Sequence, residues 1–173
     1  MSPKPATMSA QQARDLADFL LADLRMEIPT TIRVLEAVPV DKLDYAPDPK
    51  SKNALALVRH IVVDDLWFLN GIANASFAGG NNDQSDACGI MTPADGAAKY
   101  KELVPAAVAR VAALPDAKLA EELDFFGMMK LPAVTFLSLM AKHSVHHRGQ
   151  LSTYLRAMGG KVPGIYGPSG DSQ

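Results

Sequence analysis

The chain of 173 residues is long enough to enclose a hydrophobic core, and its 48% apolar and 21% charged residues are typical of a globular protein rather than a disordered one. A formal charge of −2 offers no basic surface for nucleic acid or an anionic membrane. The sequence also contains no apolar run of the roughly 18 residues that a bilayer-spanning helix needs. We therefore expect one domain over residues 1–173 that binds neither nucleic acid nor membrane.

The N-terminal stretch lacks the apolar segment of a secretory signal, and we expect residues 1–11 to form a flexible leader. Cys88 is the single cysteine, so no disulfide can form within the chain. Both features favour a reducing cytoplasm as the location of the protein.

The first helix is predicted from Leu16 to Leu35, where apolar residues recur at steps of three and four. Pro29 lies within this pattern, so we expect a kink or a break there. The proline-rich stretch 38–51 ends the helix.

The second helix is predicted to have Ser51 as its N-cap and to run to Phe77. The loop 78–89, which is rich in Gly and Asn, ends it.

The third helix is predicted to begin at Thr92 and Pro93, because a capping residue followed by proline is a strong start signal. Its apolar stripe continues to Val111, and Pro105 suggests another kink. The following segment, 114–132, is a connection in which "DFFGMM" forms a short extended piece or an irregular turn.

The fourth helix is predicted from near Pro132 to Met158, and the two glycines that follow end it. Residues 161–173 are rich in Gly and Pro and should form a loop-like tail. Four long amphipathic helices predict an all-α fold, a four-helix bundle with long connecting loops, in which the third connection leaves room for a crossover.

Histidine is concentrated in the fourth helix, which contains three of the four histidines of the chain. The apolar stripe of this helix continues through His143 and His147, so these two rings lie one turn apart on the inward face. His146 lies toward the edge of that face. His60 lies midway along the second helix, close to its expected buried face.

Two imidazoles one turn apart can bind one cation, and a third from a facing helix completes three ligands. Three protein ligands with an open position are typical of catalytic zinc sites, but imidazole also suits nickel, iron and copper. The alternative is a hydrogen-bonded histidine cluster without metal. Other sequence motifs for metal sites and nucleophiles are absent. Ser144 stands where the HExxH pattern has glutamate, and the chain has no Glu-x-x-His, CxxC, P-loop or GxSxG sequence.

The segment "HSVHHRGQLSTYLRAMGGKVPGIYG", residues 143–167, resembles the C-terminal signature of the DinB/YfiT-like family of metal-binding four-helix bundles. Residues 43–77, "LDYAPDPKSKNALALVRHIVVDDLWFLNGIANASF", are similar to the second-helix region of that family. The resemblance extends from about residue 12 to the tail.

This resemblance implies a divalent cation, zinc or nickel first and iron or manganese next, held by His60, His143 and His147. It implies that His146 does not ligate the ion. It also implies a homodimer and, as one possible activity, transfer of a low-molecular-weight thiol to a small-molecule substrate. The sequence leaves open a metal-dependent hydrolase and a non-catalytic protein in which the metal holds two helices together.

Candidates for catalysis are Asp64, one turn after His60, and Tyr154, which continues the inward stripe of the fourth helix. Asp64 could orient an imidazole or act as a base, and Asp65 could do the same, although we expect both acids to lie on the outer, solvated face. Tyr154 is expected either to line the pocket with Gln150 or to be a core residue with a satisfied hydroxyl.

The remaining expectations concern residues farther from the histidines. Arg148 is expected to form outward salt bridges, and Tyr166 could fold back as a lid over the site. Trp67 and Phe68 are expected to pack in the core. Four methionines are expected to fill the core, namely Met26, Met128, Met129 and Met140.

Overall fold

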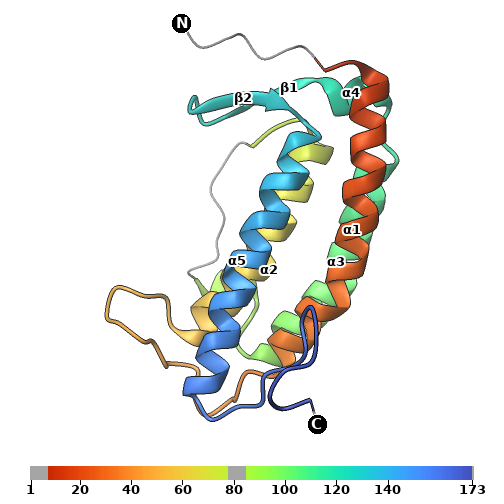
Figure 1. Ribbon diagram of the computed structural model, residues 1–173. Coiled ribbons are helices and arrows are strands. Elements are labelled where there is room, and N and C mark those ends of the chain that lie inside the picture. The colour runs from red at the N-terminus through yellow and green to blue at the C-terminus, as the bar shows by residue number, and fades with distance from the viewer. Residues whose placement is uncertain (1–7, 78–84, 173) are drawn as a thin grey trace, which may run out of the picture.

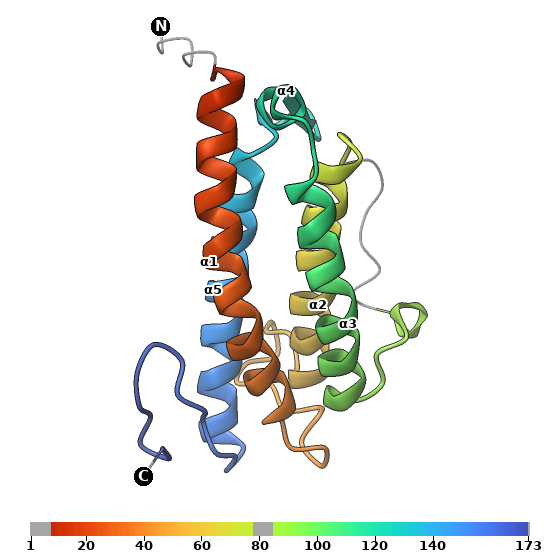
Figure 2. The same ribbon diagram turned by 90° about the vertical axis from the view of Figure 1, so that its right-hand side faces the viewer.

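A computed structural model describes residues 8–77 and 85–172 of the chain. Four long helices form a bundle: α1 (Ala10–Glu36), α2 (Ala54–Ala73), α3 (Pro93–Ala112) and α5 (Thr135–Ala157). The expected four-helix bundle is confirmed. Each helix packs on two neighbours, so that α1 and α2 lie diagonally opposite each other and both contact α3 and α5 (Figures 1 and 2).

Short elements complete the described chain. They are the 3-10 helix η1 (Asp86–Cys88), the helix α4 (Asp116–Ala120) and the antiparallel strands β1 (Glu122–Phe125) and β2 (Met129–Pro132). Among the helices of the described residues, none combines the length and the apolar character that crossing a membrane requires.

α1 begins earlier than the sequence pattern predicts. Ser9 caps it by accepting from the backbone N–H of Gln12, whose side chain in turn accepts from the backbone N–H of Ser9. Residues 10 and 11 of the expected leader are therefore helical, and residues 1–7 lie outside the described chain. Pro29 does not break α1, which is continuous from Ala10 to Glu36, and the proline lies on the exposed face of the helix.

α2 begins at Ala54 with Asn53, not Ser51, as its N-cap. The Asn53 side chain accepts from the backbone N–H of Ala56 at 2.8 Å, and the Ala54 N–H donates to the carbonyl of Tyr45 in the preceding loop. The helix ends at Ala73 rather than Phe77, and most of the loop expected after it, residues 78–84, lies outside the described chain.

α3 begins as predicted. Thr92 accepts from the backbone N–H of Asp95, whose carboxylate accepts from the N–H of Thr92, and Pro93 occupies the first helical position. Pro105 lies within the helix and does not break it.

The segment "DFFGMM" forms the turn of a β-hairpin beside the N-terminal end of α5 (Figure 1). Phe125 pairs with Met129, and both Phe126 and Gly127 have positive φ, as in a type I′ turn. Because Pro132 belongs to β2, α5 begins three residues later than expected, at Thr135.

The hairpin lies over an aromatic part of the core. The Trp67 ring lies 5.0 Å from Phe68 and 5.2 Å from Phe77 between centroids, so the expected packing role of Trp67 and Phe68 is confirmed. Of the four methionines expected in the core, only Met140 is buried, whereas Met26, Met128 and Met129 are exposed on α1 and the hairpin.

Candidate metal centre

Three histidines converge between α2 and α5. The Nε2 atom of His60 lies 3.1 Å from Nε2 of His147 and 3.1 Å from Nε2 of His143. One ring nitrogen from each residue lies within 4.8 Å of the other two. The spacing of four residues on α5 places two rings on one face, and the direct packing of α2 on α5 brings the third ring to them. The sequence prediction that these three residues meet is therefore confirmed.

Asp64 lies at the edge of this histidine cluster. Its Oδ2 atom is 3.3 Å from Nδ1 of His60 and 3.3 Å from Nε2 of His143, and the residue is buried. The expectation of a solvated outer acid is wrong because α2 packs on both α3 and α5, so Asp64, four residues after His60, stays on the inward face. A carboxylate only accepts hydrogen bonds, so a ring proton on Nδ1 of His60 faces Asp64 and leaves Nε2 of His60 as a ligand, whereas Nε2 of His143 has to lose any proton that it shares with Asp64 before it can bind a metal.

Gln150 has the same role beside His147. Its Oε1 atom lies 2.6 Å from Nδ1 of His147, which leaves Nε2 directed at the cluster. The pKa of His147 is lowered to about 4, mainly by burial and also by the neighbouring histidines, while the Gln150 hydrogen bond opposes the shift. His147 is therefore neutral at neutral pH, the form in which imidazole binds a metal.

The spacing of the nitrogens in two of the three pairs fits a metal ion. A tetrahedral zinc ion about 2.0–2.1 Å from each nitrogen holds its ligands roughly 3.3–3.4 Å apart, close to the 3.1 Å found here. A metal-free cluster fits less well. When Nδ1 of His60 and Nδ1 of His147 carry the ring protons, the two Nε2 lone pairs face each other with no proton between them.

His146 takes no part in the cluster. It is exposed, and its ring lies 4.7 Å from that of His147 between centroids. This position agrees with the expectation that His146 is a neighbour of the site and not a ligand.

A pocket of about 280 Å³ opens beside His147. Gln150 and Tyr154 line this pocket, in agreement with the expectation that both residues line a pocket beside the histidines. Lys50 and Lys52 line it as well. The Tyr154 hydroxyl donates to the carbonyl of Lys52 at 3.2 Å, so it is also satisfied within the fold.

Asp65 points to the other side of α2, into the bundle interior, where it is fully buried. Its Oδ2 atom accepts from the hydroxyls of Tyr100 and Ser144, both at 2.8 Å, and its Oδ1 atom has no hydrogen-bond partner among the described residues. Burial raises the pKa of Asp65 to about 7, although the two hydroxyls oppose the shift. The expectation that Asp65 is solvated is therefore wrong, and sequence patterns did not identify Tyr100 or Ser144 as its partners.

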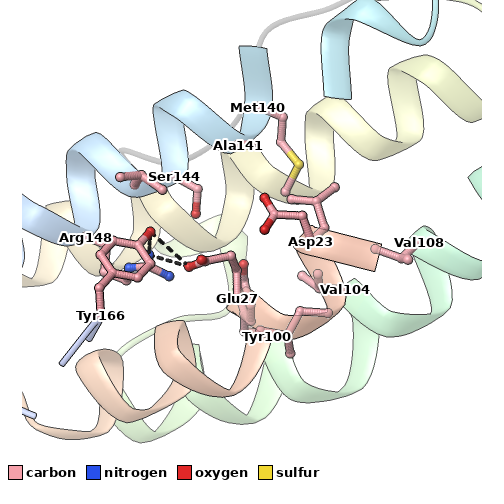
Figure 3. A pocket seen from close by; sticks show the side chains of 13 residues that line it. Asp23, Glu27, Tyr100, Val104, Val108, Met140, Ala141, Ser144, Arg148 and Tyr166 are labelled. Carbon is pink, nitrogen blue, oxygen red and sulfur yellow. Dashed lines mark hydrogen bonds and ion pairs between the residues drawn. The ribbon is translucent and has the colours of Figure 1, made fainter. Parts of the chain in front are cut away.

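Arg148 and Tyr166 lie away from the histidines. Arg148 is 1% exposed, donates to Thr31 and to the Tyr166 hydroxyl, and forms an ion pair with Glu27 (Figure 3). It was expected to point outward, but it follows Ser144 by four residues on the face of α5 that packs against α1. The tail therefore covers Arg148, and Tyr166 forms no lid over the histidine cluster.

The comparisons with known proteins agree with this architecture. The model of the DinB family matches residues 12–172. A crystal structure of a DinB-like protein from Bacillus cereus ATCC 10987 superposes with a TM-score of 0.71 and 26% identity, over 85% of this chain and 95% of that one.

Two proteins of Bacillus subtilis (strain 168), both described as uncharacterized, are also similar. YjoA is 30% identical over 132 residues, which are 75% of this chain and 82% of YjoA. Its crystal structure, named DinB-like, superposes with a TM-score of 0.67 and 26% identity over 86% of this chain and 97% of that one. YrdA is 41% identical over 54 residues, 31% of this chain and 32% of its own length. With a family match across nearly its whole length, the chain belongs to the DinB family.

Proposed function

We propose that the protein is a metal-dependent enzyme, a thiol-dependent S-transferase or a hydrolase, whose divalent cation is held by His60, His143 and His147. The observation that carries this proposal is the convergence of three imidazoles whose Nε2 atoms lie 3.1 Å apart in two of the pairs. Zinc or nickel is the preferred ion and iron the next, because imidazole suits all three metals; manganese is the last choice, because it prefers oxygen ligands.

The chemistry follows from the ligands and their partners. A bound divalent cation lowers the pKa of water to about 7 and deprotonates a bound thiol, so either nucleophile becomes available at neutral pH. Asp64 and Gln150 fix the protons of His60 and His147 on Nδ1 and thereby orient both rings. Asp64 is also close enough to the cluster to accept a proton from a reacting group.

The pocket beside His147 supports an enzyme rather than a closed structural site. It gives a small molecule direct access to a ligand of the ion, and its two lysines complement a substrate that bears an anionic group. Tyr154 forms part of its wall and could orient that substrate.

One observation favours the alternative of a non-catalytic site. Asp64 Oδ2 lies 3.3 Å from Nε2 of His143, so a small shift of this carboxylate would supply a fourth ligand and close the coordination shell. The ion would then only hold α2 and α5 together.

The remaining parts of the proposal concern the setting of the protein. We propose that it acts in the cytoplasm as a homodimer on a small-molecule substrate, with a low-molecular-weight thiol as co-substrate if it is a transferase, and that it binds neither nucleic acid nor membrane. The formal charge of −2 supports the absence of nucleic-acid and membrane binding, and the single cysteine supports the cytoplasm.

The first test is elemental analysis of the purified, untagged protein beside its His147→Ala and His146→Ala variants. We expect about one metal ion per chain in the wild type and in His146→Ala, and almost none in His147→Ala. The reason is that His147, unlike His146, directs a ring nitrogen into the cluster. Equal loss in both variants would contradict the assignment of the ligands. If the wild type carries no metal, titration with zinc, nickel and manganese must show stoichiometric binding that His147→Ala lacks.

The second test concerns turnover. The metal-loaded protein is incubated with a low-molecular-weight thiol and a panel of electrophiles, and in parallel with a panel of esters and amides. We expect faster consumption of thiol, or faster hydrolysis, than with the His147→Ala variant. Stoichiometric metal without any difference in rate, together with an Asp64 oxygen in the metal coordination shell seen by X-ray absorption, would favour the non-catalytic alternative.

A further inference from the structure

A cavity of about 60 Å³ lies between α1, α3 and α5, whereas the histidine cluster lies between α2 and α5 (Figure 3). Its polar wall contains Asp23 and Glu27 from α1, Ser144 and Arg148 from α5, and Tyr166 from the tail. The rest of its wall is the Tyr100 ring, whose hydroxyl donates to Asp65, and mostly aliphatic side chains: Leu24, Ile28, Val104, Val108, Met140, Ala141 and Val145. Cavities that stay empty are lined by apolar groups, so a cavity with this polar wall is expected to hold water or a ligand.

The positive charge of Arg148 is already matched by the fold. Its guanidinium donates to Thr31 at 3.0 Å and to the Tyr166 hydroxyl at 2.6 Å, and it pairs with Glu27. An anionic ligand would therefore have to displace the half-buried Glu27 carboxylate from a buried guanidinium, which is unfavourable.

Unmatched negative charge remains at Asp23. This residue is exposed and forms no hydrogen bond or ion pair with any other described residue, and Figure 3 shows its carboxylate directed toward the cavity. Ser144 adds a further acceptor, since its proton is donated to Asp65 and its oxygen lone pairs remain available. The cavity thus offers acceptors and excess negative charge at one end and an aliphatic wall at the other.

The cavity has an entrance. An open groove of about 430 Å³ between α1 and α5 shares Asp23, Ala141 and Val145 with the cavity, so Asp23 lies where the two meet. Lys142 and His146 line the outer part of the groove, and neither forms an ion pair with Asp23. A small molecule can therefore reach the cavity from solvent without crossing the histidine cluster.

We propose that this cavity is a binding site for a small primary alkylammonium ion. The ammonium group pairs with Asp23 and donates to Glu27 and to the Ser144 oxygen, while the alkyl chain lies against Val104 and Val108. A volume of about 60 Å³ has room for roughly four to six water-sized groups, which corresponds to a chain of three or four carbons. The site is separate from the metal centre and does not depend on its proposed activity.

The probe is n-butylammonium chloride, compared with sodium butyrate and 1-butanol at matched ionic strength. Methyl NMR spectra of the metal-free and the metal-loaded protein locate binding through the signals of Val104, Val108 and Met140. We expect these signals to shift saturably with butylammonium and not with butyrate or butanol, in both forms of the protein.

Three variants sharpen the test. Asp23→Asn should weaken binding about fivefold, the loss expected for one partly exposed ion pair. The matched control Asp15→Asn removes the same charge from an exposed position two turns earlier on α1 and should leave the affinity unchanged. Val108→Phe, checked for folding by circular dichroism, should abolish binding because the ring fills the cavity.

Other outcomes overturn the proposal. The absence of any saturable shift would mean that the cavity holds only water. If butyrate or butanol bound as tightly as butylammonium, the charge of Asp23 would not select for a cation. Shifts confined to the methyl signals of Leu57, which lies beside His147, or shifts present only in the metal-loaded protein, would place the amine on the metal.

Discussion

Neighbouring residues on α5 serve two different parts of the molecule. His143 and His147 face α2, while Ser144 and Arg148, each one residue later, face the cavity beside α1 and α3. The convergence of the histidines could be predicted because a step of four residues fixes their common face whatever packs against it. The burial of Arg148, Asp64 and Asp65 could not, because it depends on which helices cover the other faces.

Asp64 gives the sharpest prediction at this scale. Asp64→Asn should weaken cation binding about 10- to 100-fold, the usual effect of removing a carboxylate that orients a metal-binding imidazole. The loss is measured by competition with a chelating dye of known affinity. Asp44→Asn should leave the affinity unchanged, because Asp44 is exposed and forms no hydrogen bond or ion pair with any other described residue. An unchanged affinity in Asp64→Asn would show that the 3.3 Å contact with His60 does not orient the ring.

At the scale of elements, the sequence predicted the first residue of a helix correctly where the capping residues act on the backbone of that same turn. Thr92 and Pro93 predicted the first residue of α3 because both act on the backbone of that same turn. The start of α2 depended on the loop before it, where the backbone pairs Ala54 with Tyr45 and leaves Asn53 as the cap. The sequence predicted only a short extended piece or an irregular turn where the hairpin lies. A two-stranded ribbon is stabilised by packing on the helices that it covers, which the sequence pattern of the ribbon does not reveal.

The cap of α2 can be tested with a matched pair of variants. Asn53→Ala should lower the free energy of unfolding by about 1 kcal/mol, because the N–H of Ala56 loses its acceptor. Ser51→Ala should change it by less than about 0.5 kcal/mol, since the Ser51 side chain forms no hydrogen bond with any other described residue. Urea denaturation of the metal-free protein measures both. A larger loss in Ser51→Ala than in Asn53→Ala would favour the start predicted from the sequence.

At the scale of the whole molecule, the diagonal arrangement of α1 and α2 determines what α5 can do. Because α5 packs on both, it contributes histidines on one side and the wall of the cavity on the other. Asp65 on α2 connects the two sides through Tyr100 on α3 and Ser144 on α5. The sequence predicted four helices but not which of them are neighbours, so this three-helix contact could not be foreseen.

This contact makes the stability of the bundle depend on pH. Burial raises the pKa of Asp65 from 3.8 to about 7, so between these values the folded protein holds a proton that the unfolded chain has released. The stabilisation is therefore complete below about pH 4 and is lost as the pH rises through about 7. We expect the contribution of Asp65 to the free energy of unfolding to fall by a few kcal/mol between about pH 5 and 8.

Asp65→Asn isolates this contribution, because an amide accepts from Tyr100 and Ser144 at every pH and does not titrate. Urea denaturation of the metal-free protein across this pH range should show a smaller loss of stability with rising pH in the variant than in the wild type, whatever the absolute stability of the variant. Asp44→Asn, on the surface, should keep the wild-type slope. Parallel slopes in wild type and Asp65→Asn would mean that Asp65 is ionised throughout, and that its unpartnered Oδ1 atom is stabilised by a group such as bound water.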